Sequence, residues 1–449
     1  MAVTATPVDR SRVAHNTILN ILGLAVPLAL AFFVMPVAAR YLGPARFGLL
    51  GLAWAVTEYL SLFDLGLGRT TVKFVADALH RERDDLADIA SLATLIQLVA
   101  GIVGGVAFAL LAPVVVPVAF HLPPAIGAEA VAMFRVVGFN LPAVLLLSGL
   151  RGILEGAQRF DLSNGIRMLS SAASVALPGI GAVSGVSLPE IMWWVLISRA
   201  IVCALYLVAI RRALPALRWR LPRDWARARD LLSFGGWVLV SNIISPLLVY
   251  FDRFALGAIA GVAAVGFYTA PYEGVTRLLL VAVSVALSLL PTLTSLETLG
   301  ERRQAKQLVA SSGRTLMIVM AVPLAVIFAF APTLLRIWLG ANYASESSLA
   351  LRMLAIGVFA NALTQLPLVT LYALHRPDLP AKFHVVELLV HLPLTLALVH
   401  RFGIAGAAAS WTIRVSLDLV LMLAGCTRVL RTPAAALFRG ATARAAGLI

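Results

Sequence analysis

The chain has 449 residues, of which 60% are hydrophobic and 13% are charged, and its mean hydropathy is +0.93. This composition excludes a soluble enzyme or binding domain, because a soluble core cannot use so large an apolar fraction, and it indicates a polytopic membrane protein. The net charge of +14 could suggest nucleic-acid binding, but the basic residues lie in short loops between apolar segments, where anionic lipid headgroups account for them. We therefore expect membrane lipids as partners and no nucleic acid.

Apolar segments fill the chain from end to end, and each is long enough to cross a hydrocarbon core of about 30 Å as a helix. The predicted fold class is all-α, with about 12 transmembrane helices. The spans are predicted at 17–39, 47–67, 89–118, 129–150, 164–185, 190–210, 231–251, 262–292, 314–331, 349–373, 379–400 and 404–427.

Arginine and lysine are distributed unevenly between alternate loops. The termini and the loops after the even-numbered spans hold 26 of the 36 basic residues, the opposite loops hold five, and the other five lie inside spans. Cytoplasmic loops retain positive charge during insertion, so both termini are predicted to be cytoplasmic. The first 16 residues show no signal-peptide cleavage pattern, so the first span is expected to be retained.

The loop between spans 2 and 3 differs from the other loops. Its sequence KFVADALHRERDDLAD, within 69–88, predicts an amphipathic helix on the cytoplasmic surface. Phe74, Val75, Leu79 and Leu86 are available to enter the membrane interface, so this helix is expected to anchor the protein or to couple movements of its halves.

Several kinds of functional site are excluded. Cys203 and Cys426 are the two cysteines, each within a predicted span, so neither a disulfide framework nor a thiolate metal site is expected. No G-x-x-x-x-G-K-[ST] loop is present to bind nucleotide phosphates. The outer loops are too short for the catalytic loop that membrane polymerases and ligases of surface sugars usually carry. We predict a protein that is not an enzyme and has no organic cofactor.

Two segments look like copies of one hairpin: RYLGPARFGLLGLAWAVTE at 40–58 and RFALGAIAGVAAVGFYTAPYE at 253–273. Each has a basic residue, then a glycine (Gly43 or Gly257), then a second glycine (Gly48 or Gly266) that opens a span. Chance recurrence of glycine-rich turns is the alternative. Duplication predicts two parallel six-helix repeats related by an axis along the membrane normal, with a substrate path between them.

The predicted domains follow from this duplication and from the loop charges. They are a cytoplasmic N-terminus at 1–16, a first lobe at 17–212, a basic cytoplasmic loop at 213–230, a second lobe at 231–430 and a cytoplasmic tail at 431–449.

The run RYLGPARFGLLGLAWAVTEYLSLFDLGLGRTTVKFVA from Arg40 to Ala76 resembles the N-terminal signature of polysaccharide-biosynthesis flippases. DRFALGAIAGVAAVGFY at 252–268 resembles the second-lobe hairpin of the same proteins. They form the Wzx-like family of the multidrug/oligosaccharidyl-lipid/polysaccharide (MOP) exporter superfamily. The resemblance covers both predicted lobes, although no short motif is diagnostic alone.

This resemblance implies two six-helix lobes that alternate access to a central cavity. It also implies that a polyprenyl-diphosphate-linked oligosaccharide moves from the cytoplasmic to the outer face of a bacterial inner membrane, for assembly of O-antigen, exopolysaccharide or capsule. A polysaccharide polymerase and a chain-length regulator are the implied protein partners. Transport would be driven by a gradient or a potential.

Four arginines inside predicted spans are candidates for contact with such a substrate, because guanidinium groups bind phosphate oxygens bidentately. Arg199 and Arg277 are predicted near mid-membrane, too deep to reach headgroups. Arg277 either faces the cavity or pairs with Glu273, one helical turn earlier. Arg135 and Arg352 are predicted near the outer ends of their spans, where headgroup contact is the alternative.

Candidate coupling and gating residues lie in both halves. Glu58, in the middle of span 2, and Glu273 are candidates for proton coupling, because a desolvated carboxylate can hold a proton near neutral pH. The alternative for Glu58 is an ion pair with an arginine of another span. Gly43 and Gly48 are candidate gating or turn residues.

Asp252 and Arg253, at the predicted outer end of span 7, either form a surface cap or contribute to gating. Asp64 is expected to mark the cytoplasmic end of span 2. Pro27 and Pro36 in span 1 and Pro246 in span 7 predict bent helices, which suit a gated cavity but are also common in membrane helices.

Span 11 carries His384, Glu387 and His391 on one helical stripe, so a proton relay or a metal site is conceivable. A metal needs three or four converging ligands, whereas positions i and i+7 are about 10 Å apart along the axis, so no metal site is predicted. Arg414 and Asp418, spaced i, i+4 on span 12, are expected to neutralise each other.

Three rival functions remain. A multidrug or cation antiporter of the same superfamily would often place a coupling carboxylate in the first span, and residues 17–39 contain no ionisable side chain. A lipid II flippase usually has fourteen spans rather than twelve. A scaffold that transports nothing would tolerate neutral replacement of its buried charged residues.

Overall fold

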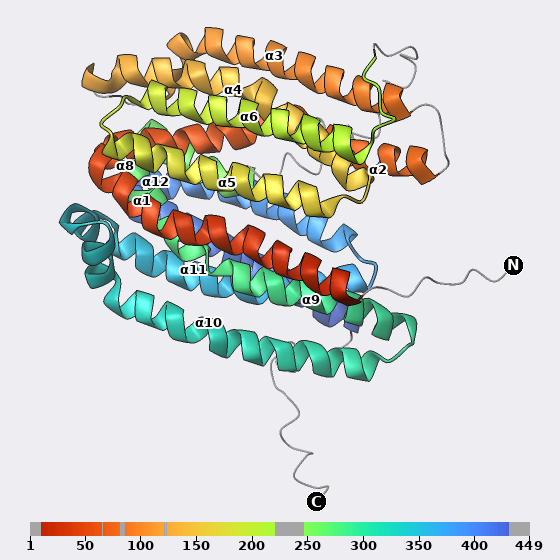
Figure 1. Cartoon of the computed structure of the whole chain (residues 1–449). Helices are drawn as coiled ribbons and strands as arrows, with labels where there is room; N and C mark the ends of the chain where they lie inside the picture. Colours follow the sequence, from red (N-terminus) through yellow and green to blue (C-terminus); the bar gives the residue numbers. More distant parts are fainter. Residues whose placement is uncertain are drawn as a thin grey trace, which may run out of the picture. The chain divides into compact units, whose positions relative to one another are not determined.

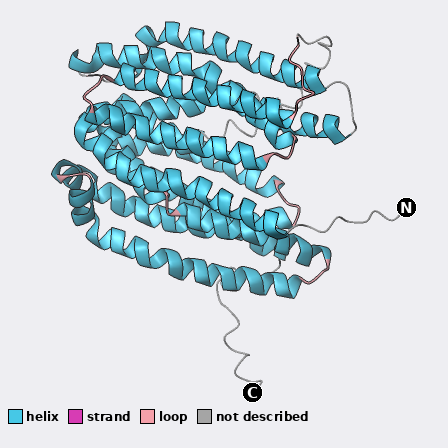
Figure 2. Ribbon diagram, in the orientation of Figure 1, coloured by secondary structure: helices cyan, strands magenta, loops and turns pink. Residues whose placement is uncertain are grey.

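A computed structural model describes residues 10–64, 66–80, 86–120, 122, 124–220 and 247–430. These residues form helices and turns and no β-strand (Figure 2). Eight of the helices in this described part are long and apolar enough to cross a membrane. The prediction of an all-α polytopic membrane protein is therefore confirmed.

The first half of the chain contains six α-helices and one 3₁₀ turn, which Figure 1 shows in chain order. They are α1 (Arg10–Leu60), η1 (Ser61–Asp64), α2 (Leu67–His80), α3 (Leu86–Ala119), α4 (Pro124–Gly156), α5 (Phe160–Val183) and α6 (Leu188–Ala213). Helix α1 combines predicted spans 1 and 2, which are separated by a break at Gly43. Span 2 ends at Leu60, so the predicted end at residue 67 was wrong.

The second half begins with an unlabelled helix over residues 247–259. It continues with α8 (Val262–Thr276), α9 (Leu279–Thr298), α10 (Arg302–Trp338), α11 (Ala341–Ala373) and α12 (Asp378–Leu430). The predicted span at 262–292 is two helices, α8 and α9, that meet at residues 277–278. Helix α12 combines predicted spans 11 and 12 across a break at Gly403.

Several predictions fall outside the described residues. These are the termini at 1–9 and 431–449, most of the basic loop between spans 6 and 7, most of span 7 with Pro246, and the side chain of Pro27.

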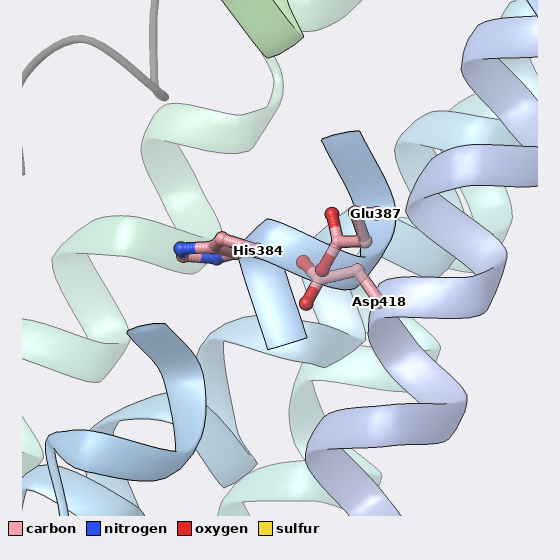
Figure 3. Close-up of side chains that lie close together, drawn as sticks. All are labelled: His384, Glu387 and Asp418. Atoms are coloured by element: carbon pink, nitrogen blue, oxygen red, sulfur yellow. The ribbon is translucent and has the colours of Figure 1, made fainter. Parts of the chain in front are cut away.

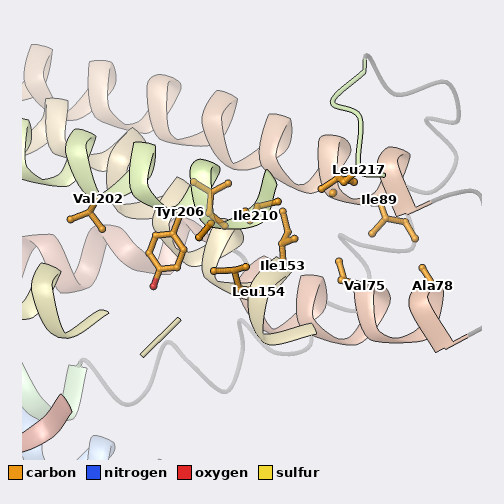
Figure 4. Close-up of a cluster of buried hydrophobic side chains, with 12 residues drawn as sticks. Val75, Ala78, Ile89, Ile153, Leu154, Val202, Tyr206, Ile210 and Leu217 are labelled. Carbon is orange, nitrogen blue, oxygen red and sulfur yellow. The ribbon is translucent and has the colours of Figure 1, made fainter. Parts of the chain in front are cut away.

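The amphipathic segment after span 2 does form a helix, α2, but its apolar face packs inside the protein. Val75 and Ala78 are buried with residues of α3, α4 and α6, including Ile89, Ile153 and Tyr206 (Figure 4). Phe74, Leu79 and Leu86 pack against the same cluster. These side chains therefore join the helices of this half and do not point into a lipid interface as predicted.

Large apolar side chains are exposed in rows along several helices. On α3 they include Val99, Val103, Leu110 and Val118, and on α10 they include Val322 and Phe330. Soluble monomers seldom expose continuous apolar faces of this extent. These rows therefore suit contact with lipid chains, in agreement with the composition.

The chain divides into two compact units. The N-terminal unit holds the described residues up to Arg46 and from Ala53 to Arg220, and the C-terminal unit holds Phe47–Leu52 and the described residues from 247 onward. Within the C-terminal unit, a Cβ atom on Gly48 would lie 1.8 Å from the backbone oxygen of Val262. The segment 47–52 belongs to this unit because its glycines allow such close contact with α8.

Residues with positive φ recur at matching connections in the two halves. Gly43 (φ 73°, ψ 168°) precedes span 2, and Gly261 (φ 83°, ψ 167°) precedes span 8. Gln158 (φ 57°) and His375 (φ 55°) follow α4 and α11, and Gly185 (φ 69°) and Gly403 (φ 53°) precede spans 6 and 12. The three pairs are 218, 217 and 218 residues apart (43 to 261, 158 to 375, 185 to 403).

These matching turns correct the alignment of the two hairpins. Gly257, which we paired with Gly43, lies inside the helix at 247–259, and the residue with matching geometry is Gly261. With this alignment both hairpins have five residues from the first glycine to the second, Gly48 or Gly266. Glu58 and Glu273 consequently do not occupy equivalent positions.

Candidate functional site

The C-terminal unit encloses a network of charged side chains around Arg253, which is 1% exposed. Its Nη2 atom donates to Glu273 Oε1 at 2.6 Å. The guanidinium also lies over the rings of Tyr250 and Tyr272, 5.1 and 5.0 Å from their centroids. A buried charge needs both a counter-ion and polarisable neighbours, and this arginine has both.

Asp252 is also buried, so the predicted surface cap at Asp252–Arg253 was wrong. Its carboxylate accepts a hydrogen bond from the backbone N–H of Arg253 at 2.7 Å and another from the hydroxyl of Tyr268. The helix continues to residue 259, beyond the predicted end of span 7, and this extension places the two charges inside the unit.

Arg277 lies where α8 ends and is paired with Glu273, as the i, i+4 spacing allows. Its Nη2 atom is 3.0 Å from Glu273 Oε2, so Glu273 bridges two arginines. The Arg277 side chain remains 40% exposed, while that of Arg253 is almost fully enclosed. Arg277 can therefore offer guanidinium N–H groups to a ligand without breaking its ion pair.

A second charged cluster joins the two halves of α12. Arg414 Nη1 lies 3.4 Å from Glu387 Oε2, so the ion pair of Arg414 crosses from span 12 to span 11. We expected Arg414 to be neutralised by Asp418 along its own helix face. Asp418 instead forms a side-chain hydrogen bond with Glu387.

His384 completes this cluster, whereas His391 does not belong to it (Figure 3). The side chains of His384, Glu387 and Asp418 present ligand-type atoms within 4.8 Å of one another, so this is the place where a metal could be held. The guanidinium of Arg414, in contact with Glu387, opposes a divalent cation there.

His391 takes part in a separate polar network. Its Nδ1 atom is 3.2 Å from the hydroxyls of both Thr395 and Ser410, which are 2.6 Å from each other. All three side chains are buried, and the ring of Phe251 lies against His391. The predicted stripe of three residues on span 11 is therefore divided between two sites.

In the N-terminal unit, Arg199 is bound by a neutral side chain. Its Nη1 atom donates to Asn140 Oδ1 of α4 at 3.0 Å. The charge of Glu58 also acts on Arg199, which agrees with the alternative that Glu58 pairs with an arginine of another span. The Glu58 side chain is exposed and Arg199 is half-buried.

Asp64 holds the start of α2 in place. Its carboxylate accepts hydrogen bonds from the Gly68 N–H at 3.0 Å, from Gln97 Nε2 at 2.5 Å and from Ser148 Oγ at 3.3 Å. These partners come from α2, α3 and α4, so Asp64 is a structural cap that joins three helices. Sequence reasoning missed Gln97 and Ser148, which lie in long apolar spans without any charged neighbour.

The remaining two candidate arginines are not alike. Arg135 lies on an exposed face of α4. Arg352 donates from Nε to the backbone oxygen of Phe328 at 3.1 Å, beside the break of α10 at Phe330. Pro332 lacks the N–H that would bind this oxygen in a helix, so Arg352 supplies the missing donor. Headgroup contact is therefore not needed to explain Arg352.

A buried serine has the same role one turn earlier on α11. Pro271 cannot donate to the oxygen of Phe267 in α8, and the Ser347 hydroxyl donates to that oxygen at 2.7 Å. Helix α11 thus satisfies carbonyl groups that prolines leave open in both α8 and α10. This role could be found from sequence only if the neighbouring helices were already known.

Gly43 and Gly48 have different surroundings. Gly43 has positive φ and open space around it, as a turn glycine does. Gly48 is a close-packing residue against α8. Nearby, Arg46 pairs with Glu129 at 2.9 Å, and Glu129 Oε1 accepts the N–H of Leu188 at 3.0 Å. This contact fixes the start of α6 next to the first turn.

The loops after α4 and α11 carry matching ion pairs. Arg159 binds Asp161 with two hydrogen bonds at 3.0 and 2.9 Å, and Arg376 binds Asp378 at 2.9 and 3.1 Å. The hydrogen bonds from these carboxylates raise the pKa of both arginines above the ordinary value. The sequences RFD and RPD were not recognised as a repeat because only the arginine and aspartate are shared.

Comparison with known proteins places the chain. The sequence profile of the family described as "Polysaccharide biosynthesis protein" matches residues 13–297. The chain is 29% identical over 412 residues to a putative O-antigen transporter of Shigella flexneri, covering 91% of this chain and 96% of the relative. It is 23% identical over 201 residues to the probable low-salt glycan biosynthesis flippase Agl15 of Haloferax volcanii, covering 44% of this chain and 42% of the relative.

Solved structures share the fold at low sequence identity. An inward-facing multidrug resistance MATE transporter of the MOP superfamily superimposes with a TM-score of 0.74 at 14% identity, covering 92% of this chain and 98% of that one. The lipid II flippase MurJ gives a TM-score of 0.73 at 12% identity, covering 94% and 89%. The family profile spans more than half of this chain, and both folds are those of MOP exporters. The chain belongs to the polysaccharide biosynthesis protein family of the MOP superfamily.

Proposed function

We propose that this protein is a flippase that moves a polyprenyl-diphosphate-linked oligosaccharide from the cytoplasmic to the outer face of a bacterial inner membrane. The observation that carries the proposal is the similarity to an O-antigen transporter over 96% of that relative's length. The similarity to a glycan flippase from a different organism supports the same substrate class. The flippase makes and breaks no covalent bond.

The proposal assigns the exposed Arg277 to the substrate diphosphate. Arg277 keeps 40% of its side chain accessible and is held by Glu273, so its guanidinium is oriented before a substrate arrives. A delocalised cation loses less on desolvation than an ammonium, which suits a phosphate site within a membrane. Arg199, with its neutral partner Asn140, is the second candidate.

The organisation that goes with this function has two six-helix lobes around a central cavity, with both termini in the cytoplasm. The matching turns at Gly43 and Gly261, Gln158 and His375, and Gly185 and Gly403 support a duplicated chain. A polysaccharide polymerase and a chain-length regulator are proposed as protein partners, because an exported lipid-linked unit must be consumed at the outer face.

Depletion in the host tests the function. We expect loss of cell-surface polysaccharide together with accumulation of polyprenyl-diphosphate-linked oligosaccharide on the cytoplasmic side. A catalytically silent scaffold for the assembly complex would also reduce surface glycan. The two are separated by replacement of Arg277, which a scaffold tolerates.

Variants of Arg277 sharpen this test. Arg277→Lys should retain part of the export activity and Arg277→Ala should lose it, at equal protein levels in the membrane. Arg302→Ala is the matched control, because Arg302 also pairs with a glutamate but lies at the exposed start of α10. Full export by the Arg277→Ala variant would refute the assignment of this residue.

A multidrug antiporter is the second candidate, favoured by the similarity of fold to a MATE transporter. A lipid II flippase is favoured equally by the fold of MurJ. The antiporter predicts unchanged glycans and altered drug sensitivity after depletion. The lipid II flippase predicts loss of cell-wall synthesis instead of loss of a separate surface polysaccharide.

A further inference from the structure

Glu387 and Asp418 form an unusual pair, because two ionised carboxylates cannot hydrogen-bond to each other. Their side chains come from spans 11 and 12, and a hydrogen bond joins them. Figure 3 shows the two carboxyl groups turned toward one another, with the ring of His384 beside them. A carboxylate has no donor, so this hydrogen bond requires one proton held by the pair.

We propose that Glu387 and Asp418 together bind one proton, and that this site couples the movement of spans 11 and 12 to a proton gradient. The proposal rests on the proposed function for its role in transport, but the proton site itself does not depend on the identity of the cargo.

The charge balance of the cluster supports a single proton. Glu387 is fully buried, and Asp418 and Arg414 are 8% and 9% exposed. Two carboxylates and one guanidinium leave one uncompensated negative charge, which is costly at this depth in a membrane. One bound proton brings the cluster to neutrality, whereas a divalent cation would leave a net positive charge.

Unpaired polar atoms lie at the same place. Among the described residues, no hydrogen-bond partner reaches Glu387 Oε1, Asp418 Oδ1 or Arg414 Nε. Buried carboxylate oxygens normally have donors, so their absence favours the protonated state, which has less need of them. The guanidinium of Arg414 remains bound to the other oxygen of Glu387 and can stabilise the pair when the proton leaves.

The other ionisable groups around the cluster come from three neighbouring elements. The charge of Asp418 acts on Tyr372 of α11, and the charge of Arg414 acts on Asp252 of the helix at 247–259 and on Tyr272 of α8. Arg253 compensates Asp252. On α12 itself, His384 is close to Asp418, and Arg414 also acts on His391. None of these supplies a second cation to Glu387 and Asp418.

Loss of the proton would change the packing of spans 11 and 12. The deprotonated pair places two like charges in contact across the two halves of α12, which meet at Gly403. Gly403 has positive φ and open space around it, so the angle between the two halves can adjust there. Deprotonation would therefore favour a state in which the two spans separate on the side of this pair.

Infrared difference spectroscopy of the purified full-length protein in nanodiscs tests the site. At neutral pH we expect a C=O stretching band of a protonated carboxyl that shifts in heavy water and declines as the pH is raised. The band should be lost in Glu387→Gln and, as an independent variant, in Asp418→Asn. Glu273→Gln is the matched control, because Glu273 is paired with two arginines and contributes no such band.

Two results would overturn the proposal. One is a wild-type spectrum without the band, or a band that persists in both variants. The other is a stoichiometric metal, detected in the wild-type protein by elemental analysis after incubation with Zn²⁺ or Mn²⁺ and lost in Glu387→Gln. Absence of glycan transport with the band present would refute the proposed function and leave the proton site standing.

A transport measurement completes the test. In proteoliposomes, an imposed pH gradient should accelerate movement of the lipid-linked oligosaccharide by the wild type and by His391→Gln. It should leave the rate of Glu387→Gln unchanged. Equal acceleration of the wild type and Glu387→Gln would show that the pair has no role in coupling.

Discussion

The two units of this protein stabilise their buried polar groups in different ways. In the N-terminal unit the partners with resolved hydrogen bonds are neutral, as Asn140 is for Arg199 and Gln97 and Ser148 are for Asp64. In the C-terminal unit charges bind charges, as Glu273 binds Arg253 and Glu387 binds Arg414. A neutral partner keeps its hydrogen bond at any pH, whereas an ion-pair network responds to each proton or anion that enters it.

This difference assigns different roles to two structurally similar halves. Their turns match at three places, so the same helical scaffold carries both sets of polar residues. The C-terminal unit contains the groups whose charge can change, and we therefore place coupling there. The N-terminal unit is expected to behave more as a rigid support.

The largest effect is expected from removal of the most enclosed charge. Arg253→Met leaves Asp252 buried and removes one of the two partners of Glu273, so it should destabilise the protein by about 3–5 kcal/mol. Thermal unfolding in detergent, followed at fixed lipid content, measures this loss.

The matched change in the N-terminal unit is Arg199→Met, which removes a hydrogen bond to a neutral amide. It should cost about 1.5–3 kcal/mol, less than Arg253→Met. Equal losses in the two variants would contradict the contrast between the units.

A second effect concerns the close contact of segment 47–52 with α8. Gly48→Leu forces atoms into the backbone around Val262 and should cost about 1–3 kcal/mol. Gly165→Ala is the control, because a Cβ atom there meets no neighbour and a helical alanine is favoured over glycine. If Gly48→Leu is as stable as Gly165→Ala, the close approach is not present in the protein.

A smaller effect distinguishes a structural arginine from a substrate-binding one. Arg352→Ala should cost about 1–2 kcal/mol, because Phe328 then loses its donor. Pro332→Ala restores the backbone N–H, so Arg352→Ala should cost less in that background. A double-mutant cycle by thermal unfolding measures the coupling, and additive effects would show that Arg352 does not serve this carbonyl.

The smallest effect tests the likeness of the halves. Arg159→Ala and Arg376→Ala each break an exposed ion pair after a positive-φ residue, so both should change the unfolding temperature slightly and by similar amounts. A large loss from one variant and none from the other would mean that these matched loops carry different loads.

Sequence reasoning reached the features that depend on composition and local spacing. Apolar length gave the helices, and i, i+4 spacing predicted that Arg277 could pair with Glu273, which the structure shows. The break at Gly43 was anticipated as a turn, but its counterpart Gly261 was missed because φ and ψ are not visible in a sequence. Gly257 looked equally suitable by its place after a basic residue.

Contacts between distant segments could not be predicted. Asp418 and Glu387 are 31 residues apart (387 to 418), and their meeting depends on the fold of α12 about Gly403. Likewise Arg352 reads as a lipid-facing or substrate-facing arginine until the carbonyl left open by Pro332 is seen beside it. A single sequence gives the residue types but not the partner helix.

Reconstitution tests the proposed activity most directly. The purified protein would be placed in liposomes with a polyprenyl-diphosphate-linked oligosaccharide, and a glycosidase outside the vesicles would report how much glycan becomes accessible with time. We predict rapid accessibility with the wild type, slow accessibility with Arg277→Ala, and no acceleration with empty liposomes. Accessibility that is no faster with the wild type than with empty liposomes would contradict a flippase.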